Sequence, residues 1–208
     1  MINSNAIFSE DRKYRYVLIR EWDLNKPVLM IICLNPSTAD EKINDPTIRR
    51  CIGFAKKWGF GKLFVTNLFS FRATKPRDLF NYDHPIGDKN DYWLKKLSGE
   101  VDKVVLAYGN HGNFKNRHSE ILKIINNPYC IKKSKIGMPT HILYISNTQK
   151  SLLVIQNSLC YWFLICRPTS FLFYPGFSTY LFLWSAKGCK SPLLIAPHFL
   201  REILSLSQ

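Results

Sequence analysis

Residues 28–50 read VLMIICLNPSTADEKINDPTIRR, and the change of composition along this stretch decides the fold class. The first part, residues 28–34, is continuously apolar, which is typical of a central strand covered on both faces. Residues 35–45 form a polar loop rich in Asn, Pro, Ser, Thr and Asp. A helix should follow, because Asp45 can cap it and Pro46 fits its first turn. A strand, a loop and a helix in this order predict one unit of an α/β domain.

The same alternation of strands and helices continues on both sides of this unit. It predicts an α/β fold with three layers, α/β/α, around a largely parallel central sheet. In such a sheet the ligand lies beyond the carboxyl ends of the strands, so the loops that follow the strands are the candidate site. Apolar runs predict further strands at residues 14–22, 62–69, 102–109 and 141–146, and helical patterns predict helices at residues 45–61, 90–101 and 113–125.

Length and composition predict one main domain with an atypical extension. A chain of 208 residues that is 46% hydrophobic can bury a core, and we assign the α/β domain to residues 1–150. Residues 151–208 are rich in aromatic side chains and contain a single acidic residue, Glu202. Their apolar runs are each shorter than the roughly 20 residues of a membrane span. Three interpretations stay open for this segment: a membrane-associating hairpin, an added aromatic layer on the core, or, as the abrupt loss of charge favours, non-native sequence from a shifted reading frame.

Charge and cysteine content indicate the class of partner and the compartment. The formal net charge of +14 favours polyanionic partners such as nucleic acid, although lysines dispersed over an ordinary solvated surface explain the same excess. Six cysteines lie far apart with no CxxC pair, and the chain begins without a signal peptide. These features predict reduced thiols in a cytoplasmic protein. The His and Cys residues show no metal-ligand spacing, so we predict neither a metal nor a cofactor.

The loop after the first buried strand offers side chains that suit recognition of a nucleobase edge, a phosphate or a carboxylate. The Asn35-Pro36 pair forces an extended or turning backbone directly after the strand. An alternative is that Asn35 and Asp45 only satisfy hydrogen bonds of the turn and the helix cap. The candidate residues of this loop and of the helix behind it are Asn35, Pro36, Ser37, Thr38, Asp40, Asp45 and Arg49.

Three further strand-end loops carry polar or cationic side chains. At the end of the strand at residues 62–69 and in the loop at residues 70–77, basic side chains alternate with Phe69 and Phe71, as a stacked base and its phosphate would require, although both rings also suit the core. Glycines in the loop at residues 109–116 permit close backbone approach. The candidate ligand contacts in these loops are Asn67, Arg72, Lys75, Gly109, Asn110 and His111, with His141 in the last loop.

Four sequence blocks, in this order, resemble the bacterial and phage family called domain of unknown function 1643. The resemblance covers roughly residues 14–147. Members of that family usually carry HPLY near the end, whereas this chain reads HILY at residues 141–144. The blocks are LNPSTAD (34–40), DPTIRRCIGFAKKWGFGKLFVTNLFSFRATKP (45–76), HPIGDKND (84–91) and AYGNHG (107–112).

The layout of these motifs is also similar, remotely, to that of the uracil-DNA glycosylase superfamily. This resemblance implies a water-activating position at Asn35 and a base-contacting position at His141, with Asp40 or Asp45 as a further catalytic group. The chain lacks a proline after His141 and lacks an intercalating loop. A shared fold does not by itself carry shared chemistry.

The sequence therefore predicts binding of a nucleotide or nucleic acid at the strand-end loops. One alternative is an N-glycosidic hydrolase that acts on a modified base or nucleoside. Another is a non-catalytic adaptor or phage-associated interaction protein, in which the Asn35 loop is only a turn.

Overall fold

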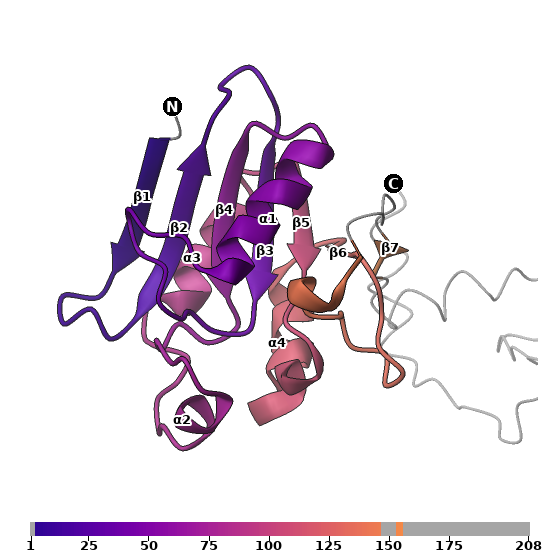
Figure 1. Ribbon diagram of the computed structural model, residues 1–208. Coiled ribbons are helices and arrows are strands. Elements are labelled where there is room, and N and C mark those ends of the chain that lie inside the picture. The colour runs from indigo at the N-terminus through magenta and orange to yellow at the C-terminus, as the bar shows by residue number, and fades with distance from the viewer. Residues whose placement is uncertain (1–2, 147–152, 156–208) are drawn as a thin grey trace, which may run out of the picture. The chain divides into compact units, whose positions relative to one another are not determined.

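A seven-stranded mixed sheet forms the centre of the fold (Figure 1). The computed structural model describes residues 3–146 and 153–155 of the chain. The strands lie in the order β1-β2-β4-β3-β5-β6-β7. Strands β4, β3, β5 and β6 run parallel, and β1, β2 and β7 are antiparallel to their neighbours. The strands are β1 (Asn3–Phe8), β2 (Arg15–Glu21), β3 (Val28–Cys33), β4 (Lys62–Asn67), β5 (Lys103–Leu106), β6 (Tyr129–Cys130) and β7 (Leu153–Val154).

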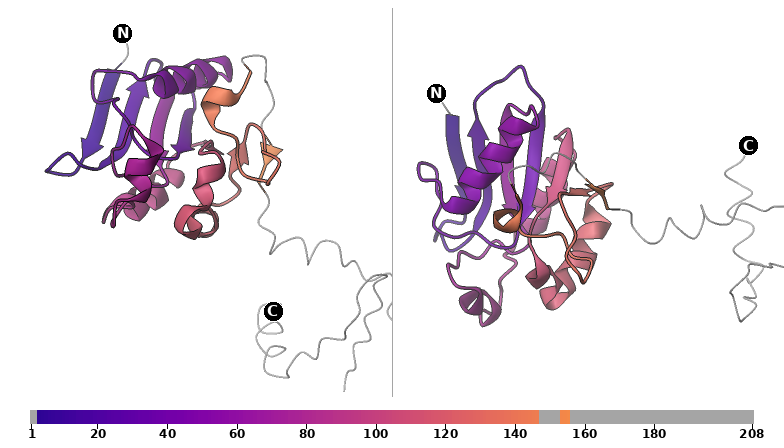
Figure 2. Two further views of the ribbon diagram at one scale, coloured as in Figure 1. Left: turned by 60° about the horizontal axis from the view of Figure 1, so that its bottom comes forward. Right: turned by 45° about the vertical axis from the view of Figure 1, so that its right-hand side comes forward.

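Helices cover the sheet from both sides. Helix α1 lies on one face, and α3 and α4 lie on the opposite face (Figure 2). Strand β3 contributes to the core on both faces of the sheet. Ile31 belongs to the core beneath α1, and the next residue, Ile32, belongs to the core beneath α3 and α4. Burial on both faces explains why this strand is apolar at every position. The helices are α1 (Pro46–Lys57), α2 (Pro76–Phe80), α3 (Asn90–Ser98) and α4 (Arg117–Ile124), with two 3-10 helices, η1 (Asn110–Asn116) and η2 (Ile142–Tyr144).

The α/β class predicted from the sequence is confirmed, and so are the strands now labelled β2 to β5 and the helices α1, α3 and α4. Helix α1 begins as predicted, with Asp45 as its cap and a proline in its first turn. The strand predicted at residues 141–146 is wrong, because this segment forms η2. There the Nδ1 atom of His141 accepts a hydrogen bond from the backbone N–H of Leu143, which caps the short helix.

Other elements also differ from the prediction. Strands β1, β6 and β7 and helix α2 have no counterpart among the predicted elements. Strand β1 carries little apolar signal in its alternating polar sequence, and β6 and β7 have only two residues each. Helix α4 begins at Arg117 instead of residue 113, because Lys115 and Asn116 adopt positive φ angles that a right-handed helix cannot contain. The interpretations of residues 151–208 concern a segment that, apart from residues 153–155, lies outside the described part of the chain.

A bulge in the β1–β2 pair sets the direction of two buried arginines. The register shifts between Ile7 and Phe8, so that Tyr16 is an extra residue on β2. Simple alternation would place Arg15 and Arg20 on opposite faces of the sheet. The bulge brings both to the face that α1 covers, where Arg15 lines a small pocket beside α1. Both arginines are buried.

A third buried arginine, Arg117, joins the helices of the other face to the sheet. Its Nε atom donates to the backbone carbonyl of Leu68, 3.0 Å away, directly after β4. Its Nη atoms bind the carboxylates of Asp91, on α3, and Glu120, on α4. The side chain of Arg117 is only 1% exposed, so this charge depends on these partners. The network fixes α3 and α4 against the end of β4.

Replacement of Arg117 should destabilise the fold strongly. Arg117→Met keeps most of the side-chain volume but removes one of the two donors to the Leu68 carbonyl and the cation that pairs with Asp91 and Glu120. We expect the free energy of unfolding to fall by about 2 kcal/mol. Urea denaturation followed by circular dichroism measures the change. Arg77→Met, at an exposed position of α2, is the matched control and should have little effect. Equal effects of the two substitutions would contradict a structural role for the network.

Candidate functional site

The loops that follow β3 and β4 are tied together at their bases. The Nδ2 atom of Asn35 donates to the backbone carbonyl of Ala73 at 2.7 Å and to that of Pro36 at 3.0 Å. The backbone N–H of Ala73 in turn donates to the carbonyl of Pro36, 3.0 Å away. Asn35 therefore uses its amide nitrogen to join two loops that are distant in sequence. This places the ends of both strands at one site.

Two arginines of β2 hold the loop at residues 35–45 by hydrogen bonds from the sheet. Arg15 donates from Nη1 to the carbonyl of Ala39 at 2.8 Å. Arg20 donates from Nη2 to the carbonyl of Asp40 at 2.7 Å and from Nε to Oδ1 of Asn44 at 2.8 Å. Burial lowers the pKa of Arg15 to about 10, and the nearby charge of Asp45 opposes that shift. Arg15 remains a cation at neutral pH.

The two aspartates of this loop have turn and cap contacts. Oδ1 of Asp40 accepts hydrogen bonds from the backbone N–H groups of Lys42 and Ile43. These bonds hold the pKa of Asp40 below its usual value. Oδ1 of Asp45 accepts from the N–H of Ile48 at 2.8 Å and caps α1. Of these two aspartates, Asp45 also lines a small pocket at the start of α1, and Asp40 does not.

A small polar pocket, which we call the inner pocket, lies between the ends of β3 and β4 and the start of α1. Its volume of about 30 Å³ matches one water molecule or one small polar group. Asn67 is 1% exposed, and neither its amide nitrogen nor its amide oxygen has a hydrogen-bond partner. An unpaired buried polar group costs about 1–3 kcal/mol. The residues that line the pocket are Arg15, Cys33, Asn35, Ser37, Asp45, Thr47, Ile48, Val65, Asn67 and His141.

His141 reaches the inner pocket from the last described loop. Burial lowers the pKa of His141, and the charge of Asp45 acts in the opposite direction. Because Nδ1 accepts the hydrogen bond from Leu143, the neutral ring carries its proton on Nε2. Gly109 lies against this residue with a φ of +77°, and a Cβ added at Gly109 would lie 3.3 Å from Cβ of His141. Glycine at this position therefore permits the close approach of the two loops.

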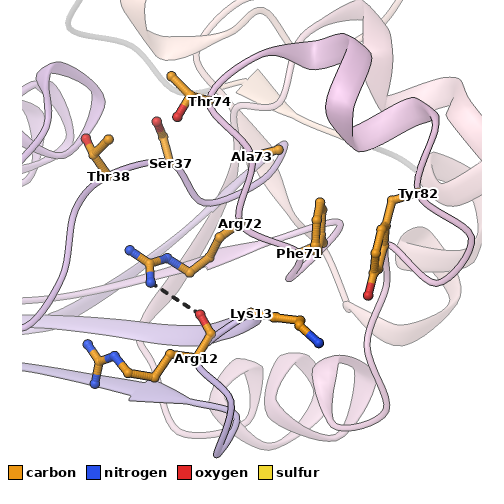
Figure 3. Close-up of a pocket in the computed structure, with 9 residues that line it drawn as sticks. All are labelled: Arg12, Lys13, Ser37, Thr38, Phe71, Arg72, Ala73, Thr74 and Tyr82. Atoms are coloured by element: carbon orange, nitrogen blue, oxygen red, sulfur yellow. Dashed lines mark hydrogen bonds between the residues drawn. The ribbon is translucent and has the colours of Figure 1, made fainter.

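A larger hollow of about 520 Å³, which we call the outer hollow, opens beside the inner pocket (Figure 3). Ser37 borders both spaces. The rings of Phe71 and Tyr82 stack on each other with centroids 3.8 Å apart and form one wall. Residues with hydroxyl groups, two arginines, one lysine and one alanine form the remaining walls. The lining residues are Arg12, Lys13, Ser37, Thr38, Phe71, Arg72, Ala73, Thr74 and Tyr82.

Several of the residues predicted from the sequence are brought together here. Asn35, Ser37, Asp45, Asn67 and His141 surround the inner pocket. Thr38 and Arg72 line the outer hollow, with Ser37 between the two spaces. Pro36 contributes its backbone carbonyl and Gly109 its close contact with His141.

Other predicted residues lie away from both spaces. Arg49 donates to the carbonyl of Asn44 on the exposed side of α1. Lys75 is exposed at the start of α2. Asn110 and His111 belong to η1, and the ring of His111 packs against Phe80 with centroids 5.2 Å apart.

The sequence reasoning missed residues that come from the N-terminal hairpin and from the segment before α3. Arg12 and Lys13 lie in the turn between β1 and β2, which could not be recognised without β1. Arg15 had a usable signal, since a cation at the start of an otherwise apolar strand must find a buried partner. Tyr82 and Thr74 carried no local signal, because only the folding of loops over the sheet brings them to the hollow.

Neither a metal cluster nor a membrane-spanning helix is found among the described residues. No three or more His, Cys, Asp or Glu side chains in residues 3–146 and 153–155 are grouped so that they could hold a metal ion. Within the same residues, no helix has the length and apolarity needed to cross a membrane.

Comparison with known proteins identifies one family. Residues 15–143 match the family described as "Protein of unknown function (DUF1643)". No curated protein and no solved structure matches the chain.

The unpaired amide of Asn67 predicts an unusual response to substitution. Asn67→Leu removes two unsatisfied polar atoms and fills the inner pocket, so we expect the free energy of unfolding to rise by roughly 1 kcal/mol. Asn90 is the matched control, because it is equally buried but donates to the carbonyls of Asn67 and Leu68. Asn90→Leu should lower the free energy of unfolding by about 2 kcal/mol. Urea denaturation measures both, and a loss of stability in both variants would show that Asn67 has a structural partner.

Proposed function

The chain belongs to the DUF1643 family, and we propose that it binds a nucleotide or a nucleic acid at the outer hollow and the inner pocket. The observation that carries this proposal is the composition of the outer hollow. Three basic residues, three serine or threonine residues and a stacked aromatic pair line one concave space.

Each part of the outer hollow suits a part of a nucleotide. Arg12 and Arg72 supply planar, charged donors that match phosphate oxygens. Phe71 and Tyr82 present a wall on which a base or a sugar can pack. A volume of about 520 Å³ lies within the range of small-molecule sites. The net charge of +14 would also draw a polyanion to the protein.

The inner pocket supplies polar recognition beside this hollow. Its volume is too small for a whole base but fits one water molecule or a projecting polar group. The unpaired amide of Asn67 offers both a donor and an acceptor there. A ligand group or a water bridge that pairs with Asn67 would remove the cost of its burial.

The proposal includes a three-layer arrangement similar to that of the uracil-DNA glycosylase superfamily, and a cytoplasmic location. Helix α1 covers one face of the sheet, and α3 and α4 cover the other, which supports the three-layer arrangement. For the second part, Cys33, Cys51 and Cys130 are free and buried, which suits a reducing compartment.

Binding of single-stranded oligonucleotides should depend on Arg72. We expect Arg72→Gln to weaken binding about tenfold, or about 1.4 kcal/mol, at physiological salt, because a charged donor to phosphate is lost. Fluorescence anisotropy with labelled DNA and RNA measures the dissociation constants at low and physiological salt. Arg77→Gln removes the same charge outside the hollow and should have little effect. Equal weakening by both substitutions, or binding that disappears with modest salt, would indicate a nonspecific charge effect.

A second candidate function is hydrolysis of an N-glycosidic bond in a modified nucleoside or nucleic acid. The observation that favours it is the inner pocket, where a space for one water lies beside the carboxylate of Asp45, with Asn35 and His141 also in its wall. In this reaction the oxygen of water attacks C1′ of the sugar, the bond from C1′ to the base nitrogen breaks, and Asp45 accepts the proton of the water. The base leaves as an anion, which the Nε2–H group of neutral His141 can stabilise by donating a hydrogen bond.

Substitution of Asp45 separates this chemistry from the capping role. Asp45→Asn keeps a good helix cap but removes the carboxylate, which also favours the buried Arg15 cation. We expect a folded protein with a slightly lower melting temperature and loss of base release. The assay follows free base by chromatography after incubation with DNA that contains modified bases. Absence of base release by the wild-type protein, or full release by Asp45→Asn, would remove the hydrolase candidate and leave the binding proposal in place.

A further inference from the structure

Arg12 lines the outer hollow with a backbone conformation that is unfavourable for arginine. It lies in the turn between β1 and β2 with a φ of +56°, a region that residues other than Gly and Asn seldom adopt. Its N–H donates to the carbonyl of Ser9 at 2.9 Å, and its own carbonyl accepts from Nη1 of Arg72 at 3.2 Å. Asn or Gly would fit this backbone with less strain. An arginine in a strained position that lines a hollow indicates a use for its side chain.

The guanidinium of Arg12 is already paired with a carboxylate of the same chain. Nη1 and Nη2 of Arg12 donate to Oε1 and Oε2 of Glu41, each at 2.9 Å. This two-pronged geometry is the one that arginine also uses for phosphate oxygens. Both side chains are substantially exposed, so the pair adds little to stability and can open at low cost. Glu41 comes from the loop at residues 35–45, whose Ser37 and Thr38 line the same hollow.

Two positive charges converge at this point. The guanidinium groups of Arg12 and Arg72 both lie over the ring of Phe8, at 4.0 and 5.1 Å from its centroid. Their charges also contribute to lowering the pKa of Asp40, after the backbone hydrogen bonds to that carboxylate. Bringing two cations together is unfavourable unless an anion lies near them. In the described structure Glu41 supplies this anion to Arg12.

We propose that the outer hollow binds a terminal phosphate group, a phosphate monoester, through Arg12 and Arg72, and that Glu41 is a built-in competitor which the phosphate displaces from Arg12. The inference rests on the proposed function, because it assigns the ligand class of the same site. The phosphate belongs either to a free mononucleotide or to the 5′ end of a nucleic acid. In both cases the group that is recognised carries the same chemistry.

A terminal phosphate fits the donors better than an internal phosphodiester. A monoester presents three terminal oxygens and close to two negative charges at neutral pH, whereas a diester presents two such oxygens and one charge. Two guanidinium groups with the hydroxyls of Ser37, Thr38 and Thr74 offer more donors than a diester can use. A dianion also neutralises both arginines, whereas Glu41 carries a single charge. This difference lets a monoester compete with Glu41 where a diester does not.

The test compares two oligonucleotides on the full-length chain. Both are short single-stranded thymidine oligonucleotides with a 3′ fluorescein, and only one carries a 5′ phosphate. We expect wild type to prefer the 5′-phosphorylated form. Glu41→Gln should tighten binding of that form by about threefold or more, the size of one lost ion pair, and should leave the 5′-hydroxyl form unchanged. Glu10→Gln removes an equal charge from an exposed position in the same turn and should change neither.

Two outcomes of this comparison would overturn the inference. One is equal tightening of both oligonucleotides in Glu41→Gln, which is a general charge effect. The other is an equal response in Glu41→Gln and Glu10→Gln. Competition with thymidine 5′-monophosphate identifies the source of the phosphate. Strong competition supports a free nucleotide, and weak competition with a retained 5′-phosphate preference supports a strand end.

Arg12→Asn gives a second test that does not depend on Glu41. Asn adopts the left-handed backbone more readily, so the melting temperature should be unchanged or higher while the 5′-phosphate preference disappears. A retained preference in this variant would overturn the inference.

Inorganic phosphate separates the inference from the proposed function. If no oligonucleotide or nucleotide binds, but phosphate alone raises the melting temperature more in Glu41→Gln than in Glu10→Gln, the phosphate site stands and the nucleotide proposal fails. If oligonucleotides bind without any 5′-phosphate preference, the nucleotide proposal stands and the inference fails.

Discussion

The candidate site depends on the hydrogen bonds from two buried arginines of β2 to the backbone of the loop at residues 35–45. Arg15 and Arg20 lie under this loop and donate to the carbonyls of Ala39 and Asp40. A polar loop over an apolar sheet would leave its carbonyl groups without donors. The two guanidinium groups satisfy them from the sheet side, so the loop can keep its other polar groups for the outside. The bulge in β2 makes this arrangement possible, because it turns both arginines to one face.

The contacts around the two spaces divide into those that hold the structure and those that are left open. Asn35 and Asn90 donate from their amide nitrogens to backbone carbonyls of neighbouring loops, although the amide oxygen of Asn90 has no partner. Asn67 is as buried as Asn90 but has no partner at either amide atom. Proteins usually satisfy such groups, so each exception requires an explanation, such as a role at a functional site. Asn67 therefore keeps a donor and an acceptor available to a polar group in the inner pocket.

Around the outer hollow, repulsion between cations is offset by nearby carboxylates. The hollow brings together cations that would repel each other, and carboxylates from the loop at residues 35–45 offset that repulsion. Because these carboxylates are partly exposed, their attraction to the arginines is weakened by water and salt. The loop thus forms part of the wall of the hollow and also supplies the carboxylate of Glu41 that pairs with Arg12.

The sequence by itself determined the α/β class, the buried strands β2 to β5 and the capped start of α1, because these depend on local apolar runs and on cap chemistry at Asp45. It also located the strand-end loops and half of the residues that line the inner pocket. It misread residues 141–146 as a strand, since the capping bond from Leu143 to the His141 side chain leaves no clear signal in a short apolar run.

Only the tertiary structure decided which side chains face the site. Alternation along β2 would separate Arg15 from Arg20, and a single extra residue in the bulge reverses that result. The hairpin turn that carries Arg12 reaches the hollow through the pairing of Tyr14 with Phe71, far apart in sequence. Such non-local pairings depend on the register of neighbouring strands, which local composition does not specify. The sequence therefore located the loops, and the pairing of the strands determined which charged side chains lie beside them.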